Sequence, residues 1–340
     1  MNVIAIVNQK GGCGKTTTSV NLSSALSKKY KTLLIDLDPQ AHSTFHLGIK
    51  DNDDKSIVRL FESSLNENYR IEEFAYKRND NLFILSSRLS LSVWEHKINQ
   101  FPERLFFLYK ILSQNSFPYE YVIIDCPPNL GLLSLNAIVA SSYILIPLLV
   151  SPFSLKALES LLQVLNLIEE KTNKKITPYY LITQFDKRAK FSLYFIEKMK
   201  KELKGRILNT IIRTNISLKE ASFKGLSIFE YKPLSRGARD YKALSEEIIN
   251  LTQNKGWAYF FFKGKDADNI YVVGDFNQWQ KDEEYKMKKI GEENWFLNIP
   301  LKKGKYRYKF LAANRWITDP LNPFQEDDSY GGKNSVLVIG

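Results

Sequence analysis

The sequence has 340 residues, of which 44% are hydrophobic and 25% are charged, an ordinary composition for a globular protein. Its two cysteines exclude a disulfide framework, and its longest apolar runs are far shorter than the roughly 20 residues that a membrane-spanning helix needs. The first residues lack the basic start and the length of a secretory leader, so we expect a cytoplasmic protein of about two domains.

The formal net charge of +11 is concentrated in one part of the chain. Residues 171–252 contain 18 Lys and Arg against 8 Asp and Glu, whereas residues 256–340 contain 13 against 12. A localised basic surface is typical of proteins that bind nucleic acid or acidic membranes, but a solvated basic face without a partner explains the same count. Charge alone leaves both alternatives open.

From the N-terminus to about residue 252, short apolar segments alternate with segments of helical periodicity. We expect strands at 3–7, 32–37, 82–85, 121–124, 143–150, 179–183 and 207–212, and helices at 16–29, 103–112, 132–140, 155–170, 193–203 and 239–251. Continuous apolar strands are typical of sheets that are buried on both faces. The alternation therefore predicts an α/β domain with an open, doubly wound and mostly parallel sheet.

The junction between the first strand and the first helix carries the most specific motif, Lys10-Gly11-Gly12-Cys13-Gly14-Lys15-Thr16-Thr17. Glycines let backbone N–H groups turn toward phosphate oxygens, and the following helix adds its positive N-terminal end. In such a loop Lys15 reaches the β- and γ-phosphates and the Thr16 hydroxyl ligates Mg²⁺. The ordinary pattern has a glycine where Gln9 stands, and here Lys10 precedes the glycine pair instead.

With this lysine the loop resembles the deviant Walker A motif of the ParA/MinD (Soj-like) P-loop ATPases. Three further segments are similar to that family, namely Asp36-Leu37-Asp38-Pro39-Gln40, Ile123-Ile124-Asp125-Cys126-Pro127-Pro128 and parts of 215–238. The resemblance covers about residues 1–252 and implies ATP and Mg²⁺ as cofactors. It implies nucleotide binding by Gly11, Gly12, Cys13, Gly14, Lys15, Thr16 and Thr17.

The resemblance also implies a mechanism for hydrolysis. ATP lies between two face-to-face copies of the chain, and Lys10 of one copy reaches the phosphates of the other. Asp38 orients the attacking water, while Thr16 and Asp125 hold the Mg²⁺ and its water shell. The expected catalytic residues are therefore Lys10, Lys15 and Asp38. Hydrolysis is expected to be slow, because the lifetime of the dimer is the useful output.

ParA-type dimers bind DNA without sequence preference through basic residues in the second half of the domain, which fits the basic stretch. The candidates are Lys187, Arg188, Lys190, Arg213, Lys219, Lys224, Arg236, Arg239 and Lys242. The family often has two adjacent basic residues where this chain has Arg213 and Thr214. A stimulating ParB-like partner protein is also expected. Membrane attachment is disfavoured, because a β-rich segment follows the last helix in place of a free amphipathic helix.

Two weaker constellations lie near the loop. Cys13 and Cys126 flank the presumed phosphate site and are interpreted as buried filler rather than as a redox switch. His42 and His46 are spaced i, i+4 beside Asp38 but lack the glutamate of a metalloprotease helix, and residues 51–54 lack the glycine and distal glutamate of an EF-hand loop. We expect neither group to hold a metal.

After a short linker at 254–256 the pattern changes to short strands separated by Gly, Asn, Asp and Pro. The strands are expected at 257–262, 270–273, 295–299, 306–311 and 335–339. They predict a small antiparallel β-sandwich at 257–340, following the ATPase domain at 1–253.

Four motifs in this segment resemble, in order, those of the glycogen-binding domain of the AMP-activated protein kinase β-subunit and the related isoamylase N-terminal module. They are 273–279, 304–310, 315–320 and 331–335. The resemblance implies that α-glucan is contacted by Trp279, Lys309, Trp316 and Asn334. Flat indole rings suit the apolar C–H face of glucose. Trp279 is expected to be exposed in a turn, whereas Trp257 and Trp295 suit the core.

The sequence leaves two cellular functions open. One is DNA segregation, in which the basic surface grips the nucleoid. The other is positioning or regulation of glycogen, with no role in DNA segregation. A non-enzymatic scaffold is a third alternative, which the retention of every residue expected for hydrolysis disfavours.

Overall fold

The structure is a computed structural model and describes residues 1–50, 55–65, 69–113, 118–151, 153–172, 174, 176–186, 188, 190–203, 206–252, 256–264, 269–290 and 293–339. Residues 51–54, considered above as a calcium loop, lie outside this set. The contacts divide the chain into two units, one of residues 1–164 with 177–250 and one of residues 165–176 with 251–340.

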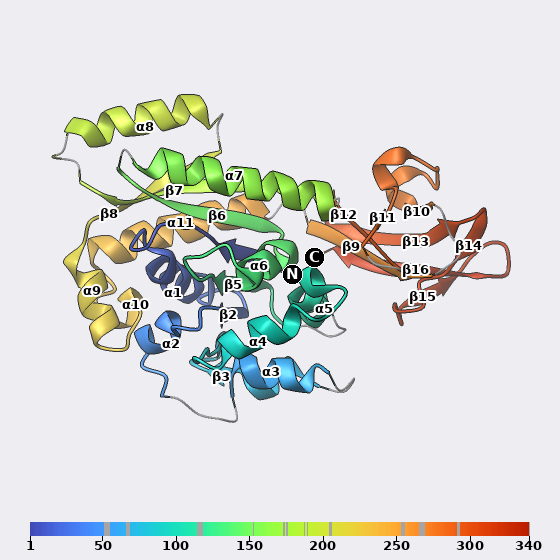
Figure 1. The fold of residues 1–340 in the computed structure, drawn as a ribbon, viewed down its shortest axis with the longest axis horizontal. Coiled ribbons are helices and arrows are strands. Elements are labelled where there is room, and N and C mark those ends of the chain that lie inside the picture. The colour runs from blue at the N-terminus through green and yellow to red at the C-terminus, as the bar shows by residue number, and fades with distance from the viewer. Residues whose placement is uncertain are drawn as a thin grey trace. The chain divides into compact units, whose positions relative to one another are not determined.

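The larger unit is built on an eight-stranded sheet in the order β3-β4-β2-β5-β1-β6-β7-β8 (Figure 1). Its strands are β1 (Asn2–Ile6), β2 (Thr32–Asp36), β3 (Tyr76–Lys77), β4 (Leu82–Leu85), β5 (Tyr121–Asp125), β6 (Tyr143–Leu149), β7 (Pro178–Phe185) and β8 (Ile207–Arg213). Every neighbouring pair is parallel except β3 with β4. The predicted mostly parallel sheet is confirmed.

The helices of this unit are α1 (Lys15–Leu26), α2 (His42–His46), α3 (Ile57–Ser63), α4 (Leu91–Ile98), α5 (Phe107–Ser113), α6 (Leu132–Ala140), α7 (Phe153–Thr172), α8 (Lys190–Glu202), α9 (Ile216–Phe223), α10 (Ile228–Tyr231) and α11 (Arg236–Thr252). Short 3₁₀ turns lie at Ile71–Phe74 and Arg104–Phe106. From β1 the chain winds in one direction to β2 and from β5 in the other to β6, and right-handed crossovers then place helices on both faces of the sheet (Figure 1). Among the described residues, no helix is both long and apolar enough to cross a membrane.

The smaller unit contains two antiparallel sheets, as predicted. One has the order β10-β13-β16-β15 with β14 paired to β13, and the other has the order β11-β12-β9. The strands are β9 (Gly256–Lys263), β10 (Ile270–Gly274), β11 (Lys288–Lys289), β12 (Asn294–Leu301), β13 (Gly304–Ala312), β14 (Arg315–Ile317), β15 (Gln325–Asp327) and β16 (Lys333–Ile339), with 3₁₀ turns at Asp275–Asn277 and Glu283–Tyr285.

Inward-facing side chains of both sheets form one apolar core, in which Phe260 and Phe262 of β9 pack against Tyr308 and Phe310 of β13. Trp295 lies in this core, as predicted. The side chain of Trp257 lies outside the described residues. Because alternate residues of each strand face the core, the remaining ones are free to build a surface site.

Candidate functional site

The loop of residues 10–17 follows β1 and leads into α1. Gly12 and Gly14 adopt left-handed φ angles of 69° and 89°, which favour glycine over any other residue. A Cβ atom added at Gly11 or Gly12 would meet no heavy atom within 4 Å, so there is open space beside the backbone at these two residues. The loop thus has the shape and the free space that a phosphate cradle needs.

The loop is held from the neighbouring strand β7. The hydroxyl of Thr183 donates to the carbonyl of Cys13 at 2.8 Å, and the side-chain amide of Gln184 donates to the carbonyl of Gly12 at 2.6 Å. Gln184 itself adopts a left-handed φ of 51°. Nothing in the local sequence around residue 183 pointed to this role, because the contact joins segments that are far apart in the chain.

The two lysines of the loop have different surroundings. Lys15 is 8% exposed, and its Nζ lies 3.4 Å from the carbonyl oxygen of Lys10. Lys10 is half-buried, and its Nζ donates to the hydroxyl of Ser151, two residues after β6, at 3.0 Å. Lys15 therefore bends back over its own loop, whereas Lys10 extends away from it.

Two buried carboxyl groups face each other beside the loop, because Asp36 of β2 is the register partner of Asp125 of β5. Asp125 accepts hydrogen bonds from the hydroxyls of Thr16, Ser19 and Ser43, the last two at 3.0 and 2.7 Å. Burial raises the pKa of Asp125. Burial and then the charge of Asp125 raise the pKa of Asp36 to about 8. Sequence reasoning missed Ser19 and Ser43, which reach Asp125 from distant segments.

Asp38 lies at the same edge of the sheet and is buried. Its Oδ1 accepts from the backbone N–H of Gln40 at 2.9 Å, and its Oδ2 lies 3.5 Å from Nδ1 of His42. His42 is exposed, but His46 is buried, and burial lowers the pKa of His46 to about 4. The two histidines thus occupy different environments, and among the described residues no group of three His, Cys, Asp or Glu side chains is placed to hold a metal.

Both cysteines are buried, and burial raises the pKa of each thiol. Since the thiolate is the reactive form, both are kept unreactive. Burial of this kind agrees with the interpretation of Cys13 and Cys126 as filler.

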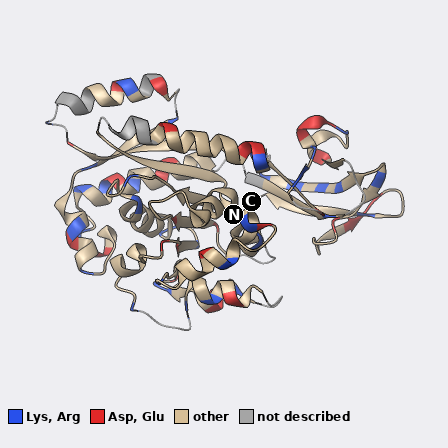
Figure 2. Cartoon of the chain, viewed as in Figure 1, with Lys and Arg blue, Asp and Glu red and all other residues tan. Residues whose placement is uncertain are grey.

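The predicted basic positions divide into exposed and paired residues. Lys219, Lys224, Arg236, Arg239 and Lys242 are exposed on α9, at its end and on α11, where Figure 2 shows Lys and Arg. Arg213 pairs with the buried Asp240, and Arg188 pairs with Asp186. Lys187 and the side chain of Lys190 lie outside the described residues.

In the smaller unit the structure brings two of the predicted sugar-contacting residues together. The rings of Trp279 and Trp316 lie 6.2 Å apart between centroids at an angle of 42°. Trp316 is 52% exposed. Trp279 is only half-exposed, which is less than predicted, because it lies against Trp316 and its indole N–H donates to Asp275 at 3.2 Å.

The two polar candidates are more enclosed. Lys309 pairs with Asp328 at 2.5 Å, and Asn334 is 6% exposed in β16, opposite Glu326 of β15. Asp328 also accepts from the backbone N–H groups of Tyr330 and Gly332, and these bonds, led by the one from Lys309, hold its pKa at about 2. The loop so fixed presents Tyr330, which is 97% exposed.

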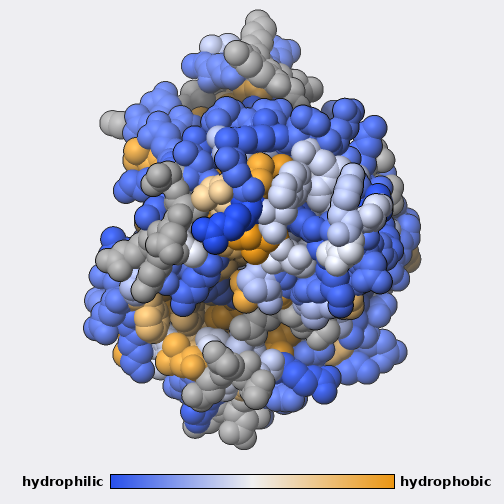
Figure 3. All heavy atoms as spheres, turned by 90° about the vertical axis from the view of Figure 1, so that its right-hand side faces the viewer, coloured by the Kyte–Doolittle hydropathy of each residue, from blue (hydrophilic) through white to orange (hydrophobic). Residues whose placement is uncertain are grey.

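Figure 3 shows the surface of the molecule after a turn of 90° about the vertical axis from the view of Figure 1. The described atoms on this face are mainly hydrophilic, with smaller groups of hydrophobic ones among them. Aromatic rings set in a polar surface are what a sugar polymer needs, because its rings stack while its hydroxyls find polar partners.

Comparison with known proteins supports both halves of this description. Residues 1–178 match the family described as an AAA domain, and residues 259–340 match the glycogen recognition site of AMP-activated protein kinase. The chain is 36% identical over 248 residues to the sporulation initiation inhibitor protein Soj of Bacillus subtilis, which covers 72% of this chain and 97% of Soj. It is 34% identical over 250 residues to the chromosome partitioning protein ParA of Myxococcus xanthus, which covers 73% of this chain and 87% of that protein.

Among solved structures, apo McdA of Cyanothece matches with a TM-score of 0.64 and 25% identity, covering 73% of this chain and 99% of that one. An ATP complex of a Cyanothece McdA variant matches with the same TM-score and identity, covering 73% of this chain and 96% of that one. The chain therefore belongs to the ParA/Soj family of P-loop ATPases, and its C-terminal residues are similar to the glycogen recognition site of AMP-activated protein kinase.

Proposed function

We propose that the chain is a ParA-type spatial switch that dimerises on ATP and hydrolyses it slowly, and whose residues 257–340 bind α-glucan. The observation that carries this proposal is the difference between the two lysines of residues 10–17. Lys15 is buried over its own loop, while Lys10 extends away from it to Ser151, and this difference supports a role for Lys10 at the phosphates of a second copy. Residues 1–253 form the ATPase domain in this proposal.

The residues around the loop fit ATP and Mg²⁺. Backbone N–H groups of residues 11–17 and the ammonium of Lys15 bind the phosphates. The Thr16 hydroxyl and the Asp125 carboxylate supply oxygen ligands, which Mg²⁺ prefers, with Asp125 acting through water. The metal ion supplies charge stabilisation for the transferred phosphoryl group. Lys10 from the second copy adds positive charge at the same phosphates.

Asp38 orients the attacking water in this mechanism. Its carboxylate lies at the carboxyl end of the sheet, and the Gln40 N–H fixes one of its oxygens while the other faces the exposed His42. Slow turnover suits a switch whose dimer must persist.

The exposed basic residues on α9, at its end and on α11 bind a polyanion, and double-stranded DNA is the partner that matches the partitioning relatives. Phosphate contacts release counterions, so this binding is without sequence preference and weakens steeply as salt is raised. A ParB-like protein that stimulates hydrolysis completes the cycle.

A second function is favoured by the aromatic pair. Trp279 and Trp316 form a surface suited to glucose rings, and a chain anchored there positions or regulates a glycogen-bound complex without DNA. In the first function the chain associates with the nucleoid, and in the second with glycogen.

One experiment separates the two functions. The steady-state ATPase rate of the full chain is measured alone, with duplex DNA, with glycogen and with both. Stimulation by DNA and not by glycogen supports segregation, and the reverse supports the glycogen function. The variant Lys15→Ala serves as the control for contaminating ATPase. A rate equal to this control under all conditions contradicts the ATPase cycle.

A further inference from the structure

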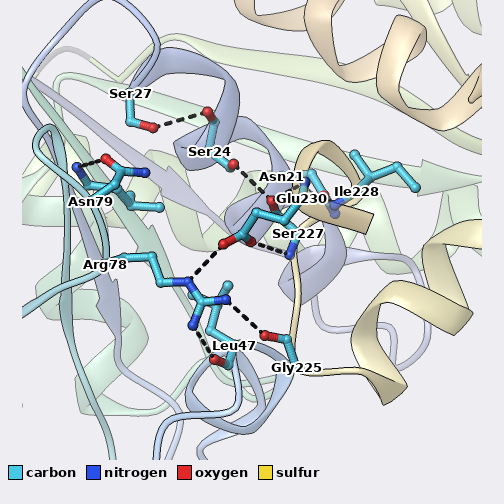
Figure 4. Close-up of polar contacts among 11 residues, drawn as sticks. Asn21, Ser24, Ser27, Leu47, Arg78, Asn79, Gly225, Ser227, Ile228 and Glu230 are labelled. Atoms are coloured by element: carbon cyan, nitrogen blue, oxygen red, sulfur yellow. Dashed lines mark hydrogen bonds and ion pairs between the residues drawn. The ribbon is translucent and has the colours of Figure 1, made fainter. Parts of the chain in front are cut away.

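Three segments of the larger unit meet at one side chain, that of Arg78 (Figure 4). They are the end of α2, the turn after β3, and the segment that runs from the α9–α10 turn into α10. We call this meeting point the Arg78 joint and define it by Leu47, Gly48, Arg78, Gly225 and Glu230.

The guanidinium group of Arg78 uses all three of its nitrogens. Nε donates to Glu230 at 2.9 Å, Nη1 to the carbonyl of Leu47 at 3.1 Å, and Nη2 to the carbonyl of Gly225 at 3.1 Å. The β3–β4 hairpin holds the backbone of Arg78, whose N–H donates to Leu82 at 2.8 Å. Because a guanidinium is planar with donors in a fixed fork, it sets the relative position of its three acceptors.

Under this fork the two backbones touch without side chains between them. A Cβ atom added at Gly225 would lie 3.1 Å from Cα of Gly48, and both glycines have left-handed φ angles, of 72° and 64°. Next to this contact the buried His46 is hydrogen-bonded to the backbone of Leu226. Since no flexible side chain separates the segments, a shift of one is passed to the other.

The α2 side of the joint leads to the nucleotide site. Ser43 of α2 donates to Asp125, and Thr44 donates to Asp36 through both its N–H and its hydroxyl. The helix has five residues, so its two ends are about one turn apart. The segment that begins after Asp38 therefore contacts the carboxylates at one end and the Arg78 joint at the other.

The other side of the joint leads to the basic surface. Gly225 directly follows the exposed Lys224 at the end of α9. Glu230 closes a capping box with Ser227 at the start of α10. The same turn is tied to the phosphate-loop helix, because Ile228 donates to Asn21 at 2.8 Å and Ser24 donates to Ser227 at 3.0 Å (Figure 4).

We propose that Arg78 is a positioning residue that couples the nucleotide site to the polyanion surface around Lys219 and Lys224, so that each site changes the affinity of the other. The inference rests on the proposed polyanion surface for the identity of the second ligand. By linkage the coupling is reciprocal: the factor by which nucleotide changes DNA affinity equals the factor by which DNA changes nucleotide affinity.

The first test measures this factor in the full chain. Affinity for a non-hydrolysable ATP analogue is measured with and without duplex DNA, and DNA affinity is measured with and without the analogue. In the wild type we expect each ligand to change the affinity for the other by a factor of about 5–150, the usual range for coupled sites. In Arg78→Ala we expect this change to be less than about twofold. Nucleotide affinity without DNA should change little, since Arg78 contacts no residue of the phosphate loop in the described structure.

Two further variants make this test specific. Arg78→Lys keeps the positive charge but loses the planar set of guanidinium donors. It should therefore fail to restore the effect of nucleotide on DNA affinity. Lys77→Ala removes a charge from the same hairpin, where Lys77 pairs with the exposed Asp80, and it should leave the factor unchanged. Full coupling in Arg78→Ala or in Arg78→Lys overturns the proposal. If Arg78→Ala unfolds, Glu230→Gln can be used, because it removes only the ion pair between Arg78 and Glu230. This variant should weaken the effect of nucleotide on DNA affinity.

A second test does not need DNA. The ATP analogue is added to the wild type and to Arg78→Ala, and amide hydrogen exchange is followed over residues 216–231. We expect the analogue to slow exchange in the wild type and to leave it unchanged in Arg78→Ala. If the wild type does not bind DNA but the two proteins still differ in their hydrogen-exchange response, the polyanion surface is wrong. The coupling through Arg78 between the nucleotide site and residues 216–231 then stands. An equal response in both proteins overturns the coupling itself.

Discussion

The ammonium group of Lys10 donates to the hydroxyl of Ser151 at 3.0 Å, which holds the lysine against the segment that follows β6. Lys15, five residues later, is buried over the loop. The two lysines of the motif therefore differ: Lys15 is enclosed by its own loop, whereas the half-buried Lys10 has its hydroxyl partner outside the loop.

Replacing this outer lysine should separate nucleotide binding from dimerisation. In Lys10→Ala we expect nucleotide affinity of the monomer within about fivefold of wild type, since surface pairs contribute only up to about 1 kcal/mol, and loss of the ATP-dependent dimer. Light scattering after size exclusion, with a non-hydrolysable analogue, measures the dimer. Lys15→Ala is the matched control and should lose nucleotide affinity itself. A Lys10→Ala dimer of unchanged affinity contradicts the assignment in trans.

Asp38→Ala should slow hydrolysis while the dimer accumulates. Removing the group that positions the water costs about 10²–10⁴-fold in rate, the usual range for general acid–base groups. Phosphate release and the dimer fraction are measured together at saturating ATP. His42→Ala, which removes an exposed neighbour of Asp38, is the control and should stay within a few-fold of the wild-type rate. Normal turnover in Asp38→Ala would remove Asp38 from the mechanism.

The double variant Trp279→Ala with Trp316→Ala should lose glycogen binding. The two rings lie 6.2 Å apart and provide the stacking surface, so we expect at least about a tenfold weaker affinity, equivalent to about 1.4 kcal/mol. Co-sedimentation with glycogen measures it. Leu321→Ala, which removes an exposed apolar side chain outside the predicted contacts, should bind normally. Undiminished retention of the double variant points to another surface.

Gly225→Ala should destabilise the ATPase unit by about 1–3 kcal/mol, because a left-handed φ strains any residue with a Cβ and the new atom would lie 3.1 Å from Gly48. Urea unfolding without nucleotide measures the loss. Gly11→Ala is the matched control: its φ is not left-handed and its Cβ would meet no atom within 4 Å, so stability should be unchanged. Equal stability of the two variants would show that the Gly48–Gly225 contact is not tight.

Buried His46 should contribute a part of the stability that is lost in acid, against the opposite contribution of Asp36, whose raised pKa favours the folded state as the pH falls. Burial lowers the pKa of His46 to about 4 in the folded state, against about 6.5 when unfolded, so the unfolded state binds more protons between these values. The stabilisation is therefore complete above about pH 6.5 and is lost as the pH falls toward 4, by on the order of 3 kcal/mol.

Urea midpoints measured from pH 7.5 to pH 5 test this dependence. His46→Leu removes the titrating group, so on going from pH 7.5 to pH 5 its stability should fall less, or rise more, than that of the wild type. His96→Gln removes an exposed histidine of α4 and should leave the slope as in the wild type. Parallel slopes for His46→Leu and the wild type would show that His46 does not carry the effect.

The sequence alone determined the fold class, because apolar runs too short for helices alternate with helical periodicity from Val3 to Leu251, and such strands are stable only in a sheet covered on both faces. It also located the phosphate loop, whose glycines are set by local backbone geometry. The short α2, α9 and α10 and the two-residue β3 were not predicted, because segments of this length carry too few residues to show a period.

Only the tertiary structure decided how the site is assembled. Ser43 reaches Asp125 across 82 residues, and Gln184 reaches Gly12 across 172, because β2, β5, β1, β6 and β7 end at one edge of the sheet. Burial likewise depends on the fold: Asn334, which the resemblance predicts to contact glucan, is buried, and Trp279, which its polar turn predicts to be exposed, is half-buried. The Arg78 joint brings together segments around residues 47, 78, 225 and 230, and local sequence does not reveal it because Arg78 donates to two backbone carbonyls that any residue could supply and the Gly48–Gly225 contact lies between two backbones.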